Sequence, residues 1–148
     1  MRSENASDCT VMTRRESRVC ALELLFDYEF NRESTPEERI ELAVENRDIE
    51  ISDFARRLFV TAVNHLDEID AALSARTENW SFGRVSTLAK TIMRLCVCEV
   101  KYLGTPAEIA INEALEVIKM YDDDKAKQFI NGVLGGVLGE SAEESKDE

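Results

Sequence analysis

Residues that bind metals or carry out redox chemistry are scarce in this sequence. Its 148 residues include one histidine, His65, and four cysteines. Cys96 and Cys98 stand two apart in a helical pattern, so their side chains point in different directions and cannot easily hold one ion. Free cysteines are most often buried and unreactive. We therefore expect neither a bound metal nor a cofactor.

Long apolar runs are also missing. The chain has no run of about eighteen apolar residues, which a helix needs to cross a membrane. The polar segment from Met1 to Thr10 lacks the apolar core of a signal peptide. The sequence therefore predicts a cytoplasmic protein with no membrane partner.

Positive charge is in short supply. The chain has 18 basic and 30 acidic residues, for a net charge of −12. Nucleic acids are bound by basic surfaces, so the net charge alone does not favour such a ligand. Much of the acidity is concentrated in residues 31–50 and 140–148, each of which carries a net charge of −4. The remaining basic residues are clustered rather than spread along the chain.

The sequence contains none of the common catalytic motifs. It has no phosphate-binding glycine loop, and Gly135-Gly136 follows a helical pattern rather than a strand. Glu99 falls on the apolar face of a predicted helix, but no second carboxylate, histidine or nucleophile is placed to work with it. We interpret Glu99 as part of a structural hydrogen-bond network rather than as a general acid, and we expect no enzymatic activity.

Helical periodicity is present along most of the chain. Apolar residues recur at spacings of three and four, and no alternating strand pattern is found. This pattern predicts an all-α helical bundle of about seven helices in a domain at 13–139, between a disordered tail at 1–12 and an acidic disordered tail at 140–148. The predicted helices start near Thr13, Thr35, Ser52 or Asp53, Val85, Thr105 and Asp122–Asp124, with a continuation or a restart at Leu66.

Three helix starts share a capping pattern. A threonine is followed three residues later by glutamate at Thr13, Thr35 and Thr105. In such a capping box, each side chain accepts a hydrogen bond from the other residue's backbone N–H.

Near the other end of the chain, Gly132 lies inside an apolar helical stripe, where glycine is unfavourable by about 1 kcal/mol relative to alanine. We therefore expect another backbone to approach Gly132 closely.

Arg14, Arg15 and Arg18 occupy the first turn and a half of one predicted helix. Positive charges at a helix N-terminus interact unfavourably with the helix dipole, so capping does not explain them. From the residues alone, a solvated surface and a binding site for an anionic partner remain equally open.

Two interpretations of Trp80 are also open. It could be a hydrophobic plug between two halves of the bundle or a platform on which RNA bases stack, and the hydrophobic plug is favoured.

Two sequence words near the C-terminus resemble a known family. They are Ala110-Ile111-Asn112-Glu113-Ala114 and Phe129-Ile130-Asn131-Gly132-Val133-Leu134. Together, and at this spacing, they resemble the C-terminal hairpin of the NusB family of bacterial transcription antitermination factors. The resemblance runs from Arg14 to Leu138 and implies two packed three-helix halves.

The resemblance also implies a function. The protein would be an RNA-binding antitermination factor that holds boxA-type leader RNA of ribosomal transcripts against transcribing RNA polymerase, together with the ribosomal protein NusE. Arg14, Arg15 and Arg18 would then contact phosphates. Lys90, Lys127 and Phe129, by their positions in the family words, would line the same groove. For Phe129, packing in the core is an equally open alternative.

A second hypothesis is a protein-only interaction module that keeps the fold but has lost its RNA-binding face. Three features motivate it besides the net charge of −12. Glu16 interrupts the basic run, Glu23 stands where the family usually has a neutral polar residue, and Ala89 replaces an acid that is usual in the family. Binding of boxA-type RNA would separate the two hypotheses.

Overall fold

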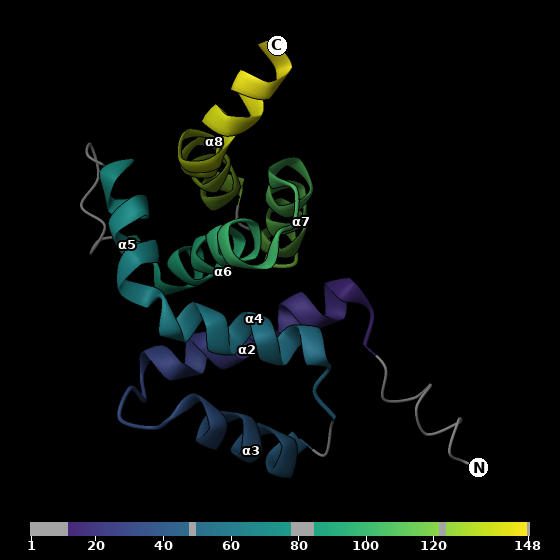
Figure 1. Cartoon of the computed structure of the whole chain (residues 1–148). Coiled ribbons are helices and arrows are strands. Elements are labelled where there is room, and N and C mark those ends of the chain that lie inside the picture. The colour runs from purple at the N-terminus through teal and green to yellow at the C-terminus, as the bar shows by residue number, and fades with distance from the viewer. Residues whose placement is uncertain (1–11, 48–49, 78–84, 122–123, 148) are drawn as a thin grey trace. The chain divides into compact units, whose positions relative to one another are not determined.

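The computed structural model describes residues 12–47, 50–77, 85–121 and 124–147, and for Arg47 and residues 140–147 it describes only the helical backbone. Within these ranges the chain forms seven α-helices and no strand (Figure 1). The predicted all-α fold is therefore confirmed. Residues 1–11 of the predicted N-terminal tail, and Trp80, lie outside the described residues. The chain divides into two compact units, residues 1–63 and 64–148.

The described part of unit 1 contains three helices, α2 (Arg14–Glu29), α3 (Pro36–Arg47) and α4 (Asp53–Asn64). Their starts follow the sequence prediction. The Thr13 and Glu16 side chains accept each other's backbone N–H at 3.0 and 2.9 Å, and Thr35 and Glu38 do the same at 3.1 and 2.9 Å. At α4, the Ser52 hydroxyl accepts from the Ala55 N–H at 3.1 Å. Each of these caps satisfies backbone donors that a helix leaves unpaired at its first turn.

Four helices lie in the described residues of unit 2, one more than in the predicted half. They are α5 (Leu66–Ala75), α6 (Thr87–Leu103), α7 (Ala107–Lys119) and α8 (Asp124–Asp147). Figure 1 shows α6 at the centre of this unit, and it packs against α5, α7 and α8. Every residue from Thr91 to Glu99 is buried, as expected for a helix that is covered on all sides.

Two charged side chains of α6 are buried, and both have partners. Arg94 donates from Nε and Nη2 to the two carboxylate oxygens of Asp70 on α5, at 2.7 and 2.9 Å. Glu99 accepts a 2.9 Å hydrogen bond from the Thr105 hydroxyl. The expected structural role of Glu99 is therefore confirmed. A buried charge without such partners would be strongly destabilising.

The predicted capping box at Thr105 is wrong. Helix α7 begins at Ala107 with Pro106 as its N-cap, and no side chain caps it. The Thr105 hydroxyl bonds Glu99 instead, and the Thr105 N–H donates to the Glu99 carbonyl at 3.1 Å. Gly104 ends α6 in the left-handed conformation with φ of 84°. The need to satisfy the buried Glu99 carboxylate thus takes the threonine away from the helix start.

The expected close approach at Gly132 is also wrong. Gly132 is exposed, and a Cβ atom placed on it would meet nothing within 4 Å. The buried face of α8 is formed by other residues of the same stripe, namely Ile130, Val133, Leu134 and Leu138. Among the glycines that the structure describes, Gly136 has a close neighbour, since a Cβ there would lie 3.4 Å from Cδ of Arg76.

The end of α8 extends past the predicted limit of the domain. The helix runs to Asp147, whereas the sequence pattern predicts an acidic tail from residue 140. The side chains after Gly139 lie outside the described residues, so the assignment of 140–148 as a tail that adds nothing to the fold stays a prediction. In the part of the chain that the structure describes, no helix is long and apolar enough to cross a membrane.

Replacing Gly132 by alanine is expected to stabilise the protein by about 0.5–1 kcal/mol, because the site is helical, exposed and open. Gly104→Ala is the matched control. It should destabilise the protein by about 1 kcal/mol or more, because its φ of 84° disfavours a side chain. Urea unfolding of both variants measures the effects, and a lower midpoint for Gly132→Ala would show that the exposed face of α8 is mis-assigned.

Removal of the Asp70 carboxylate is expected to cost about 3 kcal/mol, because Asp70→Ala takes the bidentate partner from a buried guanidinium. The Arg94 side chain is only 4% exposed, whereas the Asp70 side chain is 27% exposed, so the guanidinium is the buried member of the pair. Glu116→Ala is the control. It breaks a surface pair with Lys119 at 3.3 Å and should change the stability by less than about 1 kcal/mol. Similar unfolding free energies for the two variants would contradict the structural role of the Arg94–Asp70 pair.

Candidate nucleic-acid interface

The predicted arginine cluster lies at the start of α2 in unit 1. Arg14 and Arg15 are exposed, and Arg18, one turn later, is half-buried. Glu16 interrupts the cluster in sequence, but its carboxylate accepts the Thr13 N–H as part of the cap. The acid among the arginines is therefore explained by helix capping.

Two of these arginines stack on one aromatic ring. The guanidinium carbon of Arg14 lies 3.9 Å from the centre of the Phe54 ring, and that of Arg18 lies 5.6 Å from it. A cation over an aromatic face gains about 0.5–1 kcal/mol at an exposed site. This gain offsets the unfavourable dipole interaction of about 0.3–1 kcal/mol at a helix N-terminus. The ring thus explains how arginines are tolerated at this position.

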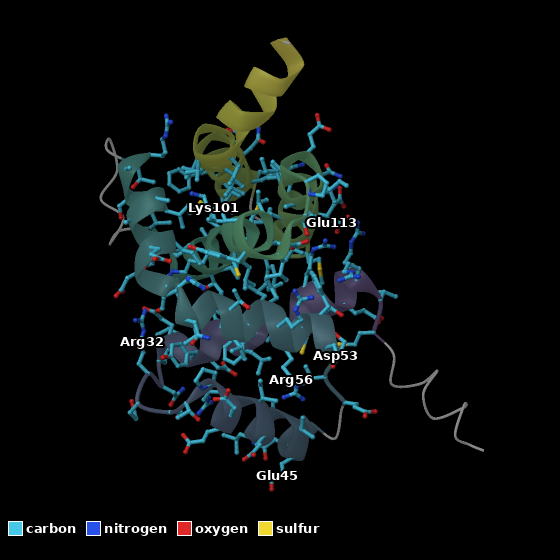
Figure 2. All side chains as sticks on the ribbon, in the orientation of Figure 1. Arg32, Glu45, Asp53, Arg56, Lys101 and Glu113 are labelled. Atoms are coloured by element: carbon cyan, nitrogen blue, oxygen red, sulfur yellow. The ribbon has the colours of Figure 1, made fainter. Side chains whose placement is uncertain are left out.

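A hydroxyl pair joins the starts of the two helices that carry the arginines and the ring. Ser17 on α2 is 1% exposed, and its Oγ lies 2.7 Å from Oγ of Ser52. Ser52 is also the capping residue of α4, two positions before Phe54. The first turns of α2 and α4 are therefore joined by a part-buried hydrogen bond. Figure 2 labels Asp53 at this end of α4 and Arg32 at the opposite end of unit 1, beyond the end of α2.

Phe54 is the residue that reasoning from the sequence missed. Its place in the apolar stripe of α4 predicts that it belongs to the core, together with Leu58 and Phe59. In the structure Leu58 and Phe59 are fully buried, whereas Phe54 is half-buried and lies under Arg14. Forty residues separate Arg14 from Phe54, and no local sequence signal indicates this contact.

The other three predicted RNA contacts lie in unit 2. Lys90 is in the first part of α6, and Lys127 and Phe129 are on α8, which packs against α6. All three are half-buried. Phe129 does not belong to the buried core, in contrast to its neighbour Ile130. Lys127 and Phe129 are two residues apart, so their side chains leave α8 in directions about 200° apart.

The structure thus brings Arg14 and Arg18 together around Phe54 within unit 1. Arg15 lies between them in sequence and is exposed. Lys90, Lys127 and Phe129 belong to the other unit. A single groove lined by all six predicted residues stays a prediction.

The thiols of the described residues are poor nucleophiles. Cys20, Cys96 and Cys98 are not joined in disulfides, and all three are buried. Burial, and then the nearby charge of Glu99, raises the pKa of the Cys98 thiol to about 12. At neutral pH this thiol is protonated, and the thiolate is the reactive form.

One polar cluster in unit 2 has the residue types of an acid–base site. His65 Nδ1 and the Tyr102 hydroxyl each lie 2.9 Å from Oε1 of Glu68, and the His65 and Tyr102 rings stack at 4.0 Å. The hydrogen bond with His65, followed by that from Tyr102, holds the pKa of Glu68 below its usual range. Glu68 is therefore ionised at neutral pH and cannot act as a general acid. No group of three potential metal ligands occurs among the described residues.

Sequence comparison supports the same assignment as the residue patterns. The model of the NusB family matches residues 15–138. The transcription antitermination protein NusB of Listeria monocytogenes is 36% identical over 131 residues, which cover 87% of this chain and 98% of that protein. NusB of Finegoldia magna is 35% identical over 130 residues, covering 86% of this chain and 94% of that protein.

Solved structures agree with the sequence comparison. NusB of T. maritima superposes with a TM-score of 0.76 at 28% identity, covering 87% of this chain and 92% of that chain. A crystal structure of the antitermination factors NusB and NusE in complex with double-stranded RNA matches with a TM-score of 0.73 at 28% identity, covering 85% and 96%. From the family match, the relatives and the shared fold together, we conclude that this chain belongs to the NusB family.

Proposed function

We propose that this protein is an RNA-binding transcription antitermination factor that binds boxA-type leader RNA together with the ribosomal protein NusE. It acts on the transcribing RNA polymerase complex, in the cytoplasm. The observation that carries the proposal is membership of the NusB family combined with the arginine cluster on α2. Relatives of this chain are antitermination proteins, and a solved NusB is bound to NusE and RNA.

Arg14, Arg15 and Arg18 supply the phosphate contacts of the proposed site. Arginine suits this role because its planar guanidinium donates two parallel hydrogen bonds to a phosphate. Three arginines neutralise about three phosphates, which gives a salt slope near −2 for single-stranded RNA at about 0.7 per contact. Lys90, Lys127 and Phe129 add contacts from unit 2.

NusE compensates for the weak electrostatic attraction of this acidic chain. A net charge of −12 opposes the approach of RNA at low ionic strength but favours encounter with a basic ribosomal protein. In the proposed complex the partner cancels part of the repulsion and contributes further phosphate contacts. RNA and NusE then bind cooperatively.

The alternative is a protein-only interaction module, and the structure bears on the observations behind it. Glu16 no longer supports this reading, because its carboxylate serves the helix cap. Ala89 is only 3% exposed, so the position where the family usually has an acid is buried here. Glu23 and the net charge still favour the alternative. A titration with boxA-like and scrambled RNA decides between the two functions.

The double variant Arg15→Glu with Arg18→Glu is expected to abolish binding of boxA-type RNA, because two phosphate contacts become repulsive. Binding of NusE should persist. Arg32→Glu is the matched control. It reverses an arginine at the other end of unit 1, where Arg32 pairs with Glu29 at 2.7 Å, and should leave the RNA affinity almost unchanged. Fluorescence anisotropy of labelled RNA measures both, and undiminished binding by the double variant would refute the arginine assignment.

The RNA affinity is expected to rise at least about tenfold when NusE is present, which corresponds to a coupling of roughly 1.4 kcal/mol. Linkage requires RNA to strengthen NusE binding by the same factor. RNA anisotropy with and without saturating NusE tests the first statement, and titration of NusE with and without RNA tests the second. Equal RNA affinities in both conditions would reject a shared site.

A further inference from the structure

The contact between one aromatic ring and two arginines gives Phe54 a role beyond packing. Arg14 and Arg18 stand four residues apart on α2, so their charges repel each other across one helical turn. Both guanidinium groups nevertheless lie over the same ring, at 3.9 and 5.6 Å from its centre. We infer that Phe54 is a positioning residue of the RNA site, which holds these guanidinium groups in place for phosphates. The inference rests on the proposed RNA-binding function.

The physical reason is preorganisation. A free arginine side chain loses rotamer freedom when it binds a phosphate, and this loss weakens binding. A ring that already restricts the guanidinium groups reduces the loss that remains. The negative face of the ring also attracts both cations and so counters their mutual repulsion. Phe54 therefore raises the RNA affinity without touching the RNA.

The ring itself is held by the fold of unit 1. The Ser17–Ser52 hydrogen bond of 2.7 Å joins α2 to the residue that caps α4, and Phe54 follows two positions later. The guanidinium of Arg14 at 3.9 Å covers a face of the ring, so a base cannot stack on that face. These contacts favour a positioning role over a direct stacking role for Phe54.

The test compares RNA binding of variants by fluorescence anisotropy with boxA-type RNA. Phe54→Leu keeps an apolar side chain but removes the aromatic face, and we expect its Kd to rise about threefold to fivefold. Phe54→Trp keeps an aromatic face and should bind within about twofold of the wild type. In a background that carries Arg14→Ala and Arg18→Ala, Phe54→Leu should have no further effect, because the groups that it positions are gone.

A second aromatic contact provides the matched control. Arg32 lies 5.9 Å from the centre of the Tyr28 ring near the other end of α2, and Tyr28→Leu should leave the RNA affinity unchanged. Thermal melting of each variant verifies its folding. If Phe54→Leu does not fold, pentafluorophenylalanine at position 54 serves in its place, since it keeps the ring shape and removes the negative face.

Each outcome bears on a different statement. Unchanged RNA affinity of folded Phe54→Leu, or of the pentafluorophenylalanine variant used in its place, overturns the positioning role while leaving the proposed function intact. An equal loss of affinity in the background without Arg14 and Arg18 also overturns it, because the ring would then act on the RNA directly. A wild-type protein that binds boxA-like and scrambled RNA no better than the double variant Arg15→Glu with Arg18→Glu overturns the proposed function itself, and the positioning role with it.

Discussion

The burial of every residue from Thr91 to Glu99 in α6 is the constraint on which the rest of unit 2 depends. A helix covered in this way must provide partners for every charge that it carries inward. Asp70 on α5 accepts a hydrogen bond from Arg94, and Thr105, in the loop before α7, donates one to Glu99. These two hydrogen bonds join α6 to the elements on either side of it in the chain. The first bond links α5 to α6, and the second lies at the turn where the left-handed Gly104 ends α6 before α7 begins.

The same requirement operates in unit 1 and leads to the candidate interface. Ser17 is a buried hydroxyl, and its bond to Ser52 satisfies it while joining the starts of two helices. Phe54 consequently lies beside the first turns of α2, where Arg14 and Arg18 lie over its ring. A structural need for hydrogen bonding thus places the aromatic ring under the arginines. The proposed binding surface is in this sense a consequence of how the unit packs.

The net charge is a poor guide to the function of this chain, and the local clustering of its charged residues is a better one. The acidic residues outnumber the basic ones by 12, yet three arginines stand together on one helix end. The acid between them is engaged at the helix cap. Screening limits the reach of the remaining charges to about 8–10 Å at physiological salt. An acidic protein can therefore present a local basic site, and its acidity suits a basic protein partner.

The sequence by itself determined the features that depend on neighbouring residues. The all-α class follows from the spacing of apolar residues. The capping boxes at Thr13 and Thr35 follow from spacing too, because the two residues of each box lie within one helical turn. At the start of α4 the sequence leaves Ser52 and Asp53 open as the cap, and the structure shows that Ser52 fills this role. The arginine cluster was equally visible. At Thr105 the same local pattern failed, since a buried carboxylate six residues earlier competes for the hydroxyl.

Only the tertiary structure decided which residues of a stripe face inward and which distant residues meet. Gly132 lies within the apolar pattern of α8, but the packing of unit 2 leaves it exposed. Phe54 has the pattern of a core residue, and only the alignment of α4 with α2 reveals its contact with Arg14, forty positions away. The spacing of apolar residues predicts the width of a helix face to within one or two residues. This spacing does not predict which other element of the fold will pack against that face.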